Sequence, residues 1–150
     1  MDVIITSRPA SEADHDFIHQ VHRLAYRNMI ERQFGYWDQP RQSGLLDCDL
    51  ATDSFEMVLW DGRPCGFFSY STDGDKIHLI NLAIHPQYQG RGVGGRILER
   101  MKARAQQKKQ PLSLGAYKTN SGARRFYEKH GFKKTGETTV HILYRWPAAH

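Results

Sequence analysis

A cluster of glycines in the second half of the chain has the composition of an anion-binding loop. It runs Gln89-Gly90-Arg91-Gly92-Val93-Gly94-Gly95, between an apolar segment and a segment with helical periodicity. Glycines leave backbone N–H groups uncovered, and a helix N-terminus adds partial positive charge, so together they favour a bound phosphate or carboxylate. Arg91 and Arg96 add positive charge. We therefore expect this segment to bind phosphate groups.

Two common phosphate-binding motifs do not fit the surroundings of this loop. The sequence contains no Walker pattern GxxxxGK[ST]. Gly90, Gly92 and Gly95 match the dinucleotide pattern GxGxxG, but that pattern belongs to a first βα unit with an acidic residue ~20 positions further on. Here hairpin-forming segments precede the loop, and residues 112–118 contain no acidic side chain. A nicotinamide cofactor is therefore not expected.

A third pattern, [QR]-x-x-G-x-[GA], is met by Gln89, Gly92 and Gly94 within the segment NLAIHPQYQGRGVGGRIL at 81–98. A second motif, NSGARRFYEKHGF, follows at 120–132. In these two motifs and in the distance between them, the sequence resembles the GCN5-related N-acetyltransferase (GNAT) family, and the resemblance covers nearly the whole chain. The resemblance implies an acetyl-CoA-dependent N-acyltransferase, with acetyl-CoA as the cosubstrate that the loop holds.

The resemblance also assigns parts of the cofactor site. It implies that Leu82 and Ile84 contact the pantetheine arm, and that a backbone N–H near Ala83 or Ile84 polarises the thioester carbonyl. Such a fixed donor would stabilise the negative charge that develops on the oxygen when an amine attacks. Residues 89–95 would hold the pyrophosphate. Asn120 would contact the cofactor, and its position also suits a helix N-cap.

Tyr127 matches the family tyrosine that protonates the departing thiolate. A phenol can act as a general acid if it lies within hydrogen-bond reach, and the alternative is an aromatic residue that packs beside Phe126 and Phe132. The general base stays open, because Asn81 stands where many family members have a glutamate. The candidates for the base are His22, His78, His85 and Glu31.

Charge is distributed unevenly along the chain. Residues 1–75 contain 6 Lys+Arg and 13 Asp+Glu, whereas residues 76–150 contain 15 and 3. The basic half suits coenzyme A, and the acidic half suits a cationic acceptor. The resemblance implies that the acceptor pocket is built by the segment after the first helix and by the last two strands. In the first of these, Tyr36 and Trp37 offer aromatic faces that attract alkylammonium groups. We expect Tyr36, Trp37 and Asn81 to bind the acceptor, a primary amine.

Two alternatives remain for the function. The first is a protein or peptide N-acetyltransferase, and the second is a non-catalytic acyl-CoA sensor on the same fold. Nucleic acid is not expected, because zinc-finger, basic-region and RNP patterns are missing. No metal is expected either: His15, His19 and His22 have a suitable helical spacing but lack an evident carboxylate partner. The family resemblance is compatible with a homodimer.

Length and composition agree with this interpretation. The 150 residues suit one domain, which we assign to 1–150. No apolar run approaches the ~18 residues of a membrane span. The N-terminus has Asp2 where a signal peptide would have a basic residue, so we expect a cytoplasmic protein with no membrane partner. Cys48 and Cys65 are too few for a disulfide framework.

The predicted elements follow the α/β (α+β) order of the GNAT fold, a central mixed, mostly antiparallel sheet of six to seven strands flanked by about four helices. The pattern predicts a short strand at 3–6, broken at 8–10, and then a helix from Ser11 to about Arg32. Residues 34–54 predict a loop, a short helix near 40–50 and another loop. The later elements are predicted as strands at 55–60, 65–71 and 76–84, a helix to about Gln107, a strand at 112–117, a helix ending at His130, and two final strands. Asp61-Gly62 predicts a hairpin turn after the first of these strands, and Gly131 followed by Phe132 predicts a Schellman stop at the end of the last helix.

Overall fold

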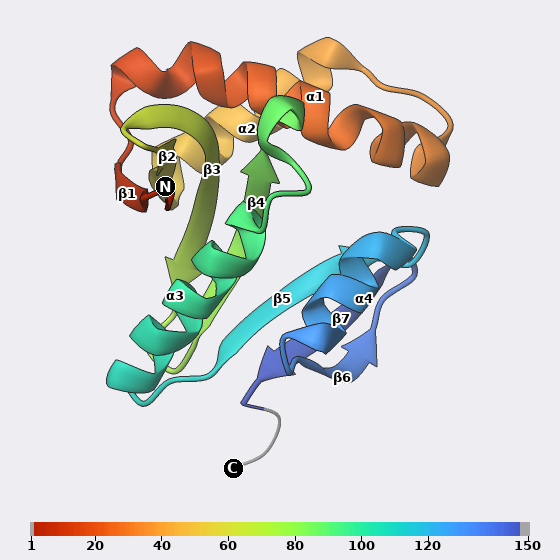
Figure 1. Ribbon diagram of the computed structural model, residues 1–150. Helices are drawn as coiled ribbons and strands as arrows, with labels where there is room; N and C mark the ends of the chain where they lie inside the picture. Colours follow the sequence, from red (N-terminus) through yellow and green to blue (C-terminus); the bar gives the residue numbers. More distant parts are fainter. Residues whose placement is uncertain (1, 148–150) are drawn as a thin grey trace. The chain divides into compact units, whose positions relative to one another are not determined.

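The computed structural model describes residues 2–147 of the chain. This part contains seven strands, four α-helices and two short 3-10 helices, and Figure 1 labels the strands and the α-helices. The elements, in chain order, are β1 (Ile5–Pro9), η1 (Glu12–Asp14), α1 (His15–Phe34), α2 (Gln39–Thr52), β2 (Ser54–Trp60), β3 (Arg63–Thr72), β4 (Ile77–Ile84), η2 (Pro86–Tyr88), α3 (Val93–Gln107), β5 (Leu112–Tyr117), α4 (Ser121–Lys129), β6 (Lys133–Glu137) and β7 (His141–Trp146).

The strands form one mixed sheet. Their hydrogen-bonded order is β1-β2-β3-β4-β5-β7-β6. β4 and β5 pair in parallel, and the pairs β1–β2, β2–β3, β5–β7 and β6–β7 are antiparallel. The mixed, mostly antiparallel sheet with flanking helices is the predicted fold class, which is thereby confirmed.

Two compact units make up the chain, and β3, β4 and α3 each contribute residues to both. Unit 1 comprises the chain up to Tyr70 together with Asn81–Gly94. Unit 2 comprises Ser71–Ile80 and the chain from Gly95 onward. The proposed coenzyme A loop lies in unit 1 up to Gly94, and its last residue, Gly95, lies in unit 2 together with Asn120 and Tyr127.

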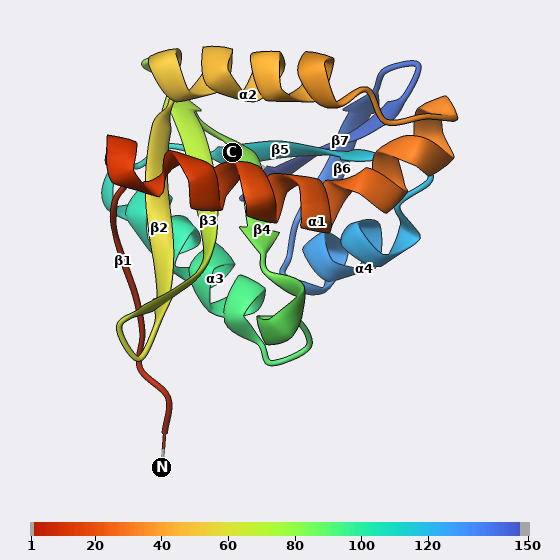
Figure 2. The ribbon, with the colours of Figure 1, turned by 90° about the horizontal axis from the view of Figure 1, so that it is seen from above.

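The core of unit 1 lies between the first two helices and the sheet. Figure 2 shows α1 running across β2 and β3, and α2 starting beside it and reaching one end of these strands. The buried side chains that join these layers come from both helices and from three strands: Ile18, Val21, Leu46, Phe55, Met57, Phe67 and Ala83. Burial of this apolar area fixes α1 on the sheet, and with it the polar and aromatic side chains that α1 carries.

A carboxylate holds the short helix η1, which leads directly into α1. The Asp14 side chain accepts hydrogen bonds from the Ser11 backbone N–H at 2.8 Å and from the Ser11 hydroxyl at 3.2 Å. Both terminal guanidinium nitrogens of Arg8 donate to it as well, at 2.8 and 3.0 Å. These hydrogen bonds from Arg8 hold the pKa of the Asp14 carboxyl well below its usual range.

The structure corrects two of the predicted boundaries. The first strand begins at Ile5 and continues through Pro9, so the break predicted at 8–10 is wrong. β1 is the edge strand of the sheet, where a proline removes no needed ladder hydrogen bond. Residues 39–52 form a helix of 14 residues, longer than predicted, with Asp38 as its N-cap and Leu46 buried.

In unit 2, β5 and β7 have one buried and one open face. Along β5, Leu112, Leu114 and Ala116 are buried, and the residues between them are exposed or half-buried. β7 alternates in the same way, with Ile142 and Tyr144 buried. The Tyr144 hydroxyl donates to Glu128 of α4 at 2.7 Å, so the buried face is the one that α4 covers.

Candidate active site

The glycine loop between β4 and α3 adopts a conformation that requires glycine. Gly90 and Gly92 have φ angles of +76° and +80°. Residues with side chains rarely adopt this left-handed region of positive φ, and this explains why the motif has glycine at both positions. α3 begins at Val93, directly after the second left-handed residue. The first N–H groups of a helix have no partner within the helix, which makes this junction suitable for an anion.

Gln89 has a structural role in the loop. Its side-chain amide donates to the backbone carbonyl of Ile84 at 2.8 Å and so ties the loop back to the end of β4. Arg91 is directed elsewhere: its guanidinium carbon lies 5.5 Å from the centre of the Trp60 ring. Trp60 in turn packs against Tyr88, with ring centres 5.4 Å apart. These contacts brace both sides of the loop within unit 1.

The end of β4 presents alternate residues to opposite faces. Ala83 is buried in the core of unit 1, and Leu82 and Ile84 are half-buried. β3 approaches this segment so closely that a Cβ atom at Gly66 would collide with the carbonyl oxygen of Ala83. The side chain of Ala83 is therefore committed to packing, and its backbone is what it could offer to a ligand.

A contact that the sequence did not indicate involves Tyr26 of α1. The backbone N–H of Leu82 donates to the Tyr26 hydroxyl at 3.3 Å. One backbone donor of the predicted cofactor strand is thus engaged by a side chain 56 residues away in the sequence. No local pattern could have indicated this pairing, because it depends on how α1 packs on the sheet.

Three aromatic rings gather on the same side of unit 1. The centre of the His22 ring lies 5.0 Å from that of Tyr26 and 5.8 Å from that of Trp37. The indole N–H of Trp37 donates to Gln39 at 2.9 Å, and Trp37 itself is half-buried. The structure therefore brings Trp37 to the His22–Tyr26 pair, whereas its predicted partner Tyr36 is 63% exposed.

Burial makes His22 a weak base. Desolvation, with a smaller contribution from the nearby His19, lowers the pKa of His22 to about 4. The imidazole is therefore neutral at neutral pH. The same surroundings penalise any other cation, so an alkylammonium group that entered them would lose its proton more readily than in water.

The other predicted base candidates and Asn81 each have a partner. His85 accepts from the N–H of Gln87 at 3.1 Å, and Glu31 pairs with Arg27 at 2.8 Å. The amide of Asn81 donates to the hydroxyl of Ser69, a fully buried residue of β3, at 2.9 Å. His78 lies in unit 2, where its Nδ1 is 2.8 Å from the Ser113 hydroxyl.

Glu56 is a buried polar residue that the sequence analysis missed. It lies in β2 and is 8% exposed. Its carboxyl oxygens accept from the Ser7 hydroxyl at 3.1 Å and from the Tyr70 hydroxyl at 2.9 Å. An acidic residue inside the apolar run SFEMVLW was the available signal, because a charged side chain is seldom buried without partners.

α4 of unit 2 carries the second motif. The side-chain oxygen of Asn120 accepts from the N–H of Ala123 at 3.1 Å, which confirms the predicted N-cap. The helix ends in a Schellman motif: Phe132 N–H donates to the Tyr127 carbonyl and Gly131 N–H to that of Glu128, both at 3.1 Å. Both ends of the short helix are thus fixed by the residues predicted to fix them.

Tyr127 lies among aromatic rings on α4. Its ring centre is 5.3 Å from that of Phe126, 6.0 Å from Phe132 and 6.2 Å from Tyr144. Desolvation raises the pKa of Tyr127 to about 12. The phenol therefore keeps its proton throughout the neutral range, as a general acid requires, while its ring packs as the alternative interpretation expected.

Within residues 2–147, no three histidine, cysteine or acidic side chains gather in a way that could hold a metal ion. His19, one of the spaced histidines, contacts Asp47 at 2.8 Å, and His22 contacts aromatic rings. Cys65 is buried and Cys48 is exposed. No helix in the described part of the chain is long and apolar enough to cross a membrane.

Comparison with known families assigns the chain. The sequence profile described as acetyltransferase (GNAT) domain matches residues 52–134, more than half of the chain. The chain belongs to the GNAT acetyltransferase family. The matched range includes the glycine loop and the motif on α4. The GNAT domain is accordingly an acetyl-CoA-dependent N-acyltransferase, as the sequence motifs predicted. A search of curated proteins found no match.

Solved structures agree with the GNAT fold. The PaiA N-acetyltransferase from Thermoplasma acidophilum in complex with coenzyme A has a TM-score of 0.74 and 18% identity, over 95% of this chain and 98% of that one. A GNAT family acetyltransferase from Elizabethkingia anophelis with acetyl-CoA bound has a TM-score of 0.71 and 19% identity, over 94% and 96%. The ribosomal-protein-S18-alanine N-acetyltransferase from Escherichia coli has a TM-score of 0.74 and 18% identity, over 98% and 96%.

Proposed function

We propose that residues 1–150 act as one acetyltransferase domain that transfers an acetyl group from acetyl-CoA to a primary amine, with a small molecule as the acceptor. The observation that carries the proposal is the left-handed glycine loop at the start of α3, which follows β4 directly. Its backbone donors suit the pyrophosphate of coenzyme A. The solved relatives whose titles name coenzyme A or acetyl-CoA support the same ligand.

In the proposed reaction, the neutral amine nitrogen attacks the thioester carbonyl carbon. The carbonyl oxygen gains negative charge, and a backbone N–H near Ala83 or Ile84 stabilises it. The intermediate then collapses: the positively charged nitrogen releases a proton to water, the bond from carbon to sulfur breaks, and the thiolate of coenzyme A leaves. The products are the acetylated amine and the free thiol.

Tyr127 supplies the proton for the departing sulfur in this proposal. A pKa of about 12 keeps the phenol protonated until the sulfur needs it. The same high pKa makes Tyr127 a weak acid, so we expect its contribution near the lower end of the usual range for acid catalysis, about 10²-fold. Asn120, the N-cap of α4, contacts the cofactor in this proposal.

The acceptor amine is proposed to enter beside Trp37 and the first helix. The aromatic faces of Trp37 and Tyr26 attract an alkylammonium group. The desolvation that lowers the pKa of His22 to about 4 would also lower that of the incoming ammonium, which can then lose its proton to water. This removes the need for the glutamate that Asn81 replaces. Tyr36 and Asn81 complete the proposed acceptor side.

A screen for thiol release tests the proposal. Purified protein is incubated with acetyl-CoA and with polyamines, aliphatic and aryl amines, amino acids or short peptides, and free thiol is measured against the rate without acceptor. We expect a small primary amine to give the highest kcat/KM. A peptide as the best acceptor would favour the alternative of a peptide N-acetyltransferase. Tight binding of acetyl-CoA with no turnover on any acceptor would favour a sensor.

A further inference from the structure

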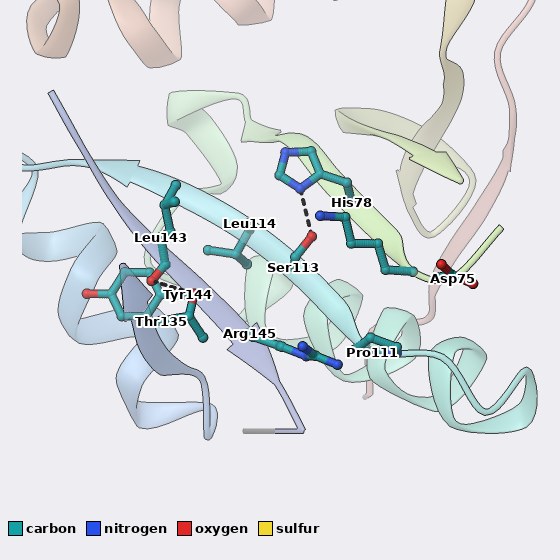
Figure 3. Close-up of a pocket in the computed structure, with 10 residues that line it drawn as sticks. Asp75, His78, Pro111, Ser113, Leu114, Thr135, Leu143, Tyr144 and Arg145 are labelled. Carbon is teal, nitrogen blue, oxygen red and sulfur yellow. Dashed lines mark hydrogen bonds between the residues drawn. The ribbon is translucent and has the colours of Figure 1, made fainter. Parts of the chain in front are cut away.

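A cavity of about 320 Å³ lies in unit 2, on the open face of the sheet (Figure 3). Residues at the beginnings of β4 and β5 line it, together with residues of β6 and β7. The volume is at the lower end of the range for small-molecule sites. None of the residues assigned above to the coenzyme A loop, the acid or the acceptor lines this cavity.

Three polar side chains form a row across three neighbouring strands of this cavity. His78 of β4 pairs in register with Ser113 of β5, and Ser113 pairs with Arg145 of β7. Side chains at paired positions lie on the same face of a sheet and within contact range. Figure 3 shows the imidazole of His78 directed at the Ser113 hydroxyl, where the nitrogen and oxygen are 2.8 Å apart.

Arg145 leaves a donor without an acceptor in this row. Its Nε atom is buried, and no hydrogen-bond partner for it exists among residues 2–147. A buried donor without a partner is unfavourable, more so on a charged group, and such atoms usually have an acceptor that is not part of the chain. Arginine is also the side chain best shaped to bind a carboxylate or phosphate through two nitrogens.

The charges around the cavity favour an anion. Lys76 and Arg145 line it with positive charge, against one carboxylate, that of Asp75. Unit 2 as a whole has 14 Lys+Arg and 5 Asp+Glu. A basic surface of this kind raises the local concentration of small anions.

The cavity and Tyr127 belong to opposite faces of β7. Tyr144 turns toward α4, where its ring lies 6.2 Å from that of Tyr127. Arg145, the next residue, turns to the other face because side chains alternate along a strand. A ligand on the row is therefore separated from the proposed acid by the thickness of the strand.

We propose that the row of His78, Ser113 and Arg145, with Lys76, is a binding site for the carboxylate or phosphate group of a small molecule, separate from the acetyl-transfer site. The guanidinium of Arg145 holds the oxyanion, the Ser113 hydroxyl donates to it, and Lys76 adds charge at the rim. No group is transferred there. The site suits an anionic effector, and it does not depend on which amine the enzyme acetylates.

Titration of the 150-residue chain with inorganic phosphate and, separately, with citrate tests this proposal. Isothermal titration calorimetry gives the affinity, and amide chemical shifts of residues 78, 113 and 145 locate the bound ion. We expect saturable binding of at least one anion, with these shifts moving. Tighter binding of phosphate would identify a phosphate group as the ligand of the site, and tighter binding of citrate would identify a carboxylate.

Two variants and a matched control decide the outcome. Arg145→Gln should weaken binding by about tenfold or more, because it removes a charge-assisted contact. Ser113→Ala keeps every charge and should weaken anion binding less than Arg145→Gln does. It also provides a second test of the site if Arg145→Gln does not fold. Arg23→Gln makes the same change on an exposed part of α1 and should bind as wild type does. The proposal is overturned if neither anion binds, or if both variants bind as tightly as the control.

Discussion

Replacing Gly66 with alanine would place a methyl group against the backbone of β4. The Cβ atom would overlap the carbonyl oxygen of Ala83 and lie 3.1 Å from the Cα atom of Ile84. Backbone atoms cannot rotate away as the end of a flexible side chain can, so β3 and β4 must separate locally. Overpacking of this kind costs roughly 1–3 kcal/mol of the free energy of unfolding. For a chain of this size, that corresponds to a fall in Tm of about 2–12 °C.

The local separation of β3 and β4 should also lower the rate of acetyl transfer. Ala83 and Ile84 belong to the segment proposed to hold the thioester, and small displacements of positioned groups reduce rates steeply. We expect Gly66→Ala to lower kcat/KM for acetyl transfer at a temperature where circular dichroism shows the variant folded. The two measurements are thermal unfolding and steady-state thiol release.

Gly44→Ala provides the matched control. Gly44 lies in the exposed face of α2, and a Cβ atom there meets nothing within 4 Å. Alanine is favoured over glycine inside a helix by up to about 1 kcal/mol, so this variant should melt at or above the wild-type temperature. If Gly66→Ala has the same Tm as Gly44→Ala and keeps its activity, then β3 does not approach β4 as closely as described.

Three further outcomes are expected. Tyr127→Phe should lower kcat by about 10²-fold with little change in acetyl-CoA affinity, and unchanged turnover with chemistry limiting would assign Tyr127 to packing alone. Trp37→Ala should raise the KM for the acceptor far more than that for acetyl-CoA, and wild-type kcat/KM should fall as ionic strength rises; an anionic best acceptor would contradict both. Because the pKa of Asp14 is lowered in the folded protein, its carboxylate stabilises the fold at pH values above its ordinary pKa, and this stabilisation is lost as pH falls. The free energy of unfolding measured with urea should therefore fall more on acidification for wild type than for Asp14→Asn. Parallel falls in the two proteins would refute this.

Elements set by local chemistry could be predicted from the sequence. Asp61 and Gly62 both have positive φ, as the predicted hairpin turn between β2 and β3 requires. The strand at 112–117 and the glycine stop after α4 were predicted at the residues where they occur. In each case the signal was a residue type with a restricted backbone or a short periodic pattern, and it needed no knowledge of distant packing.

The boundaries and contacts that the sequence did not predict depend on the assembled fold. The length of α2 depends on Leu46 being buried against the sheet, and the passage of β1 through Pro9 depends on β1 being an edge strand. Neither fact is local. In the site, the loop residues were predicted from the spacing of the motif, whereas the bond between Tyr26 and Leu82 and the bond between Ser7 and Glu56 join residues about 50 positions apart. Such contacts appear only once the fold is assembled.

Binding of acetyl-CoA to two aspartate variants tests the central claim, that the glycine loop before α3 holds the cofactor. Gly92 and Gly62 have nearly equal φ angles, +80° and +84°, and a Cβ atom meets nothing within 4 Å at either position. The two substitutions therefore impose similar strain and the same charge, one at the proposed phosphate site and one in the β2–β3 turn. By isothermal titration calorimetry, Gly92→Asp should bind acetyl-CoA at least about tenfold more weakly than wild type, a loss of about 1.4 kcal/mol or more, and Gly62→Asp should bind as wild type does. Equal affinities for all three proteins would contradict the account.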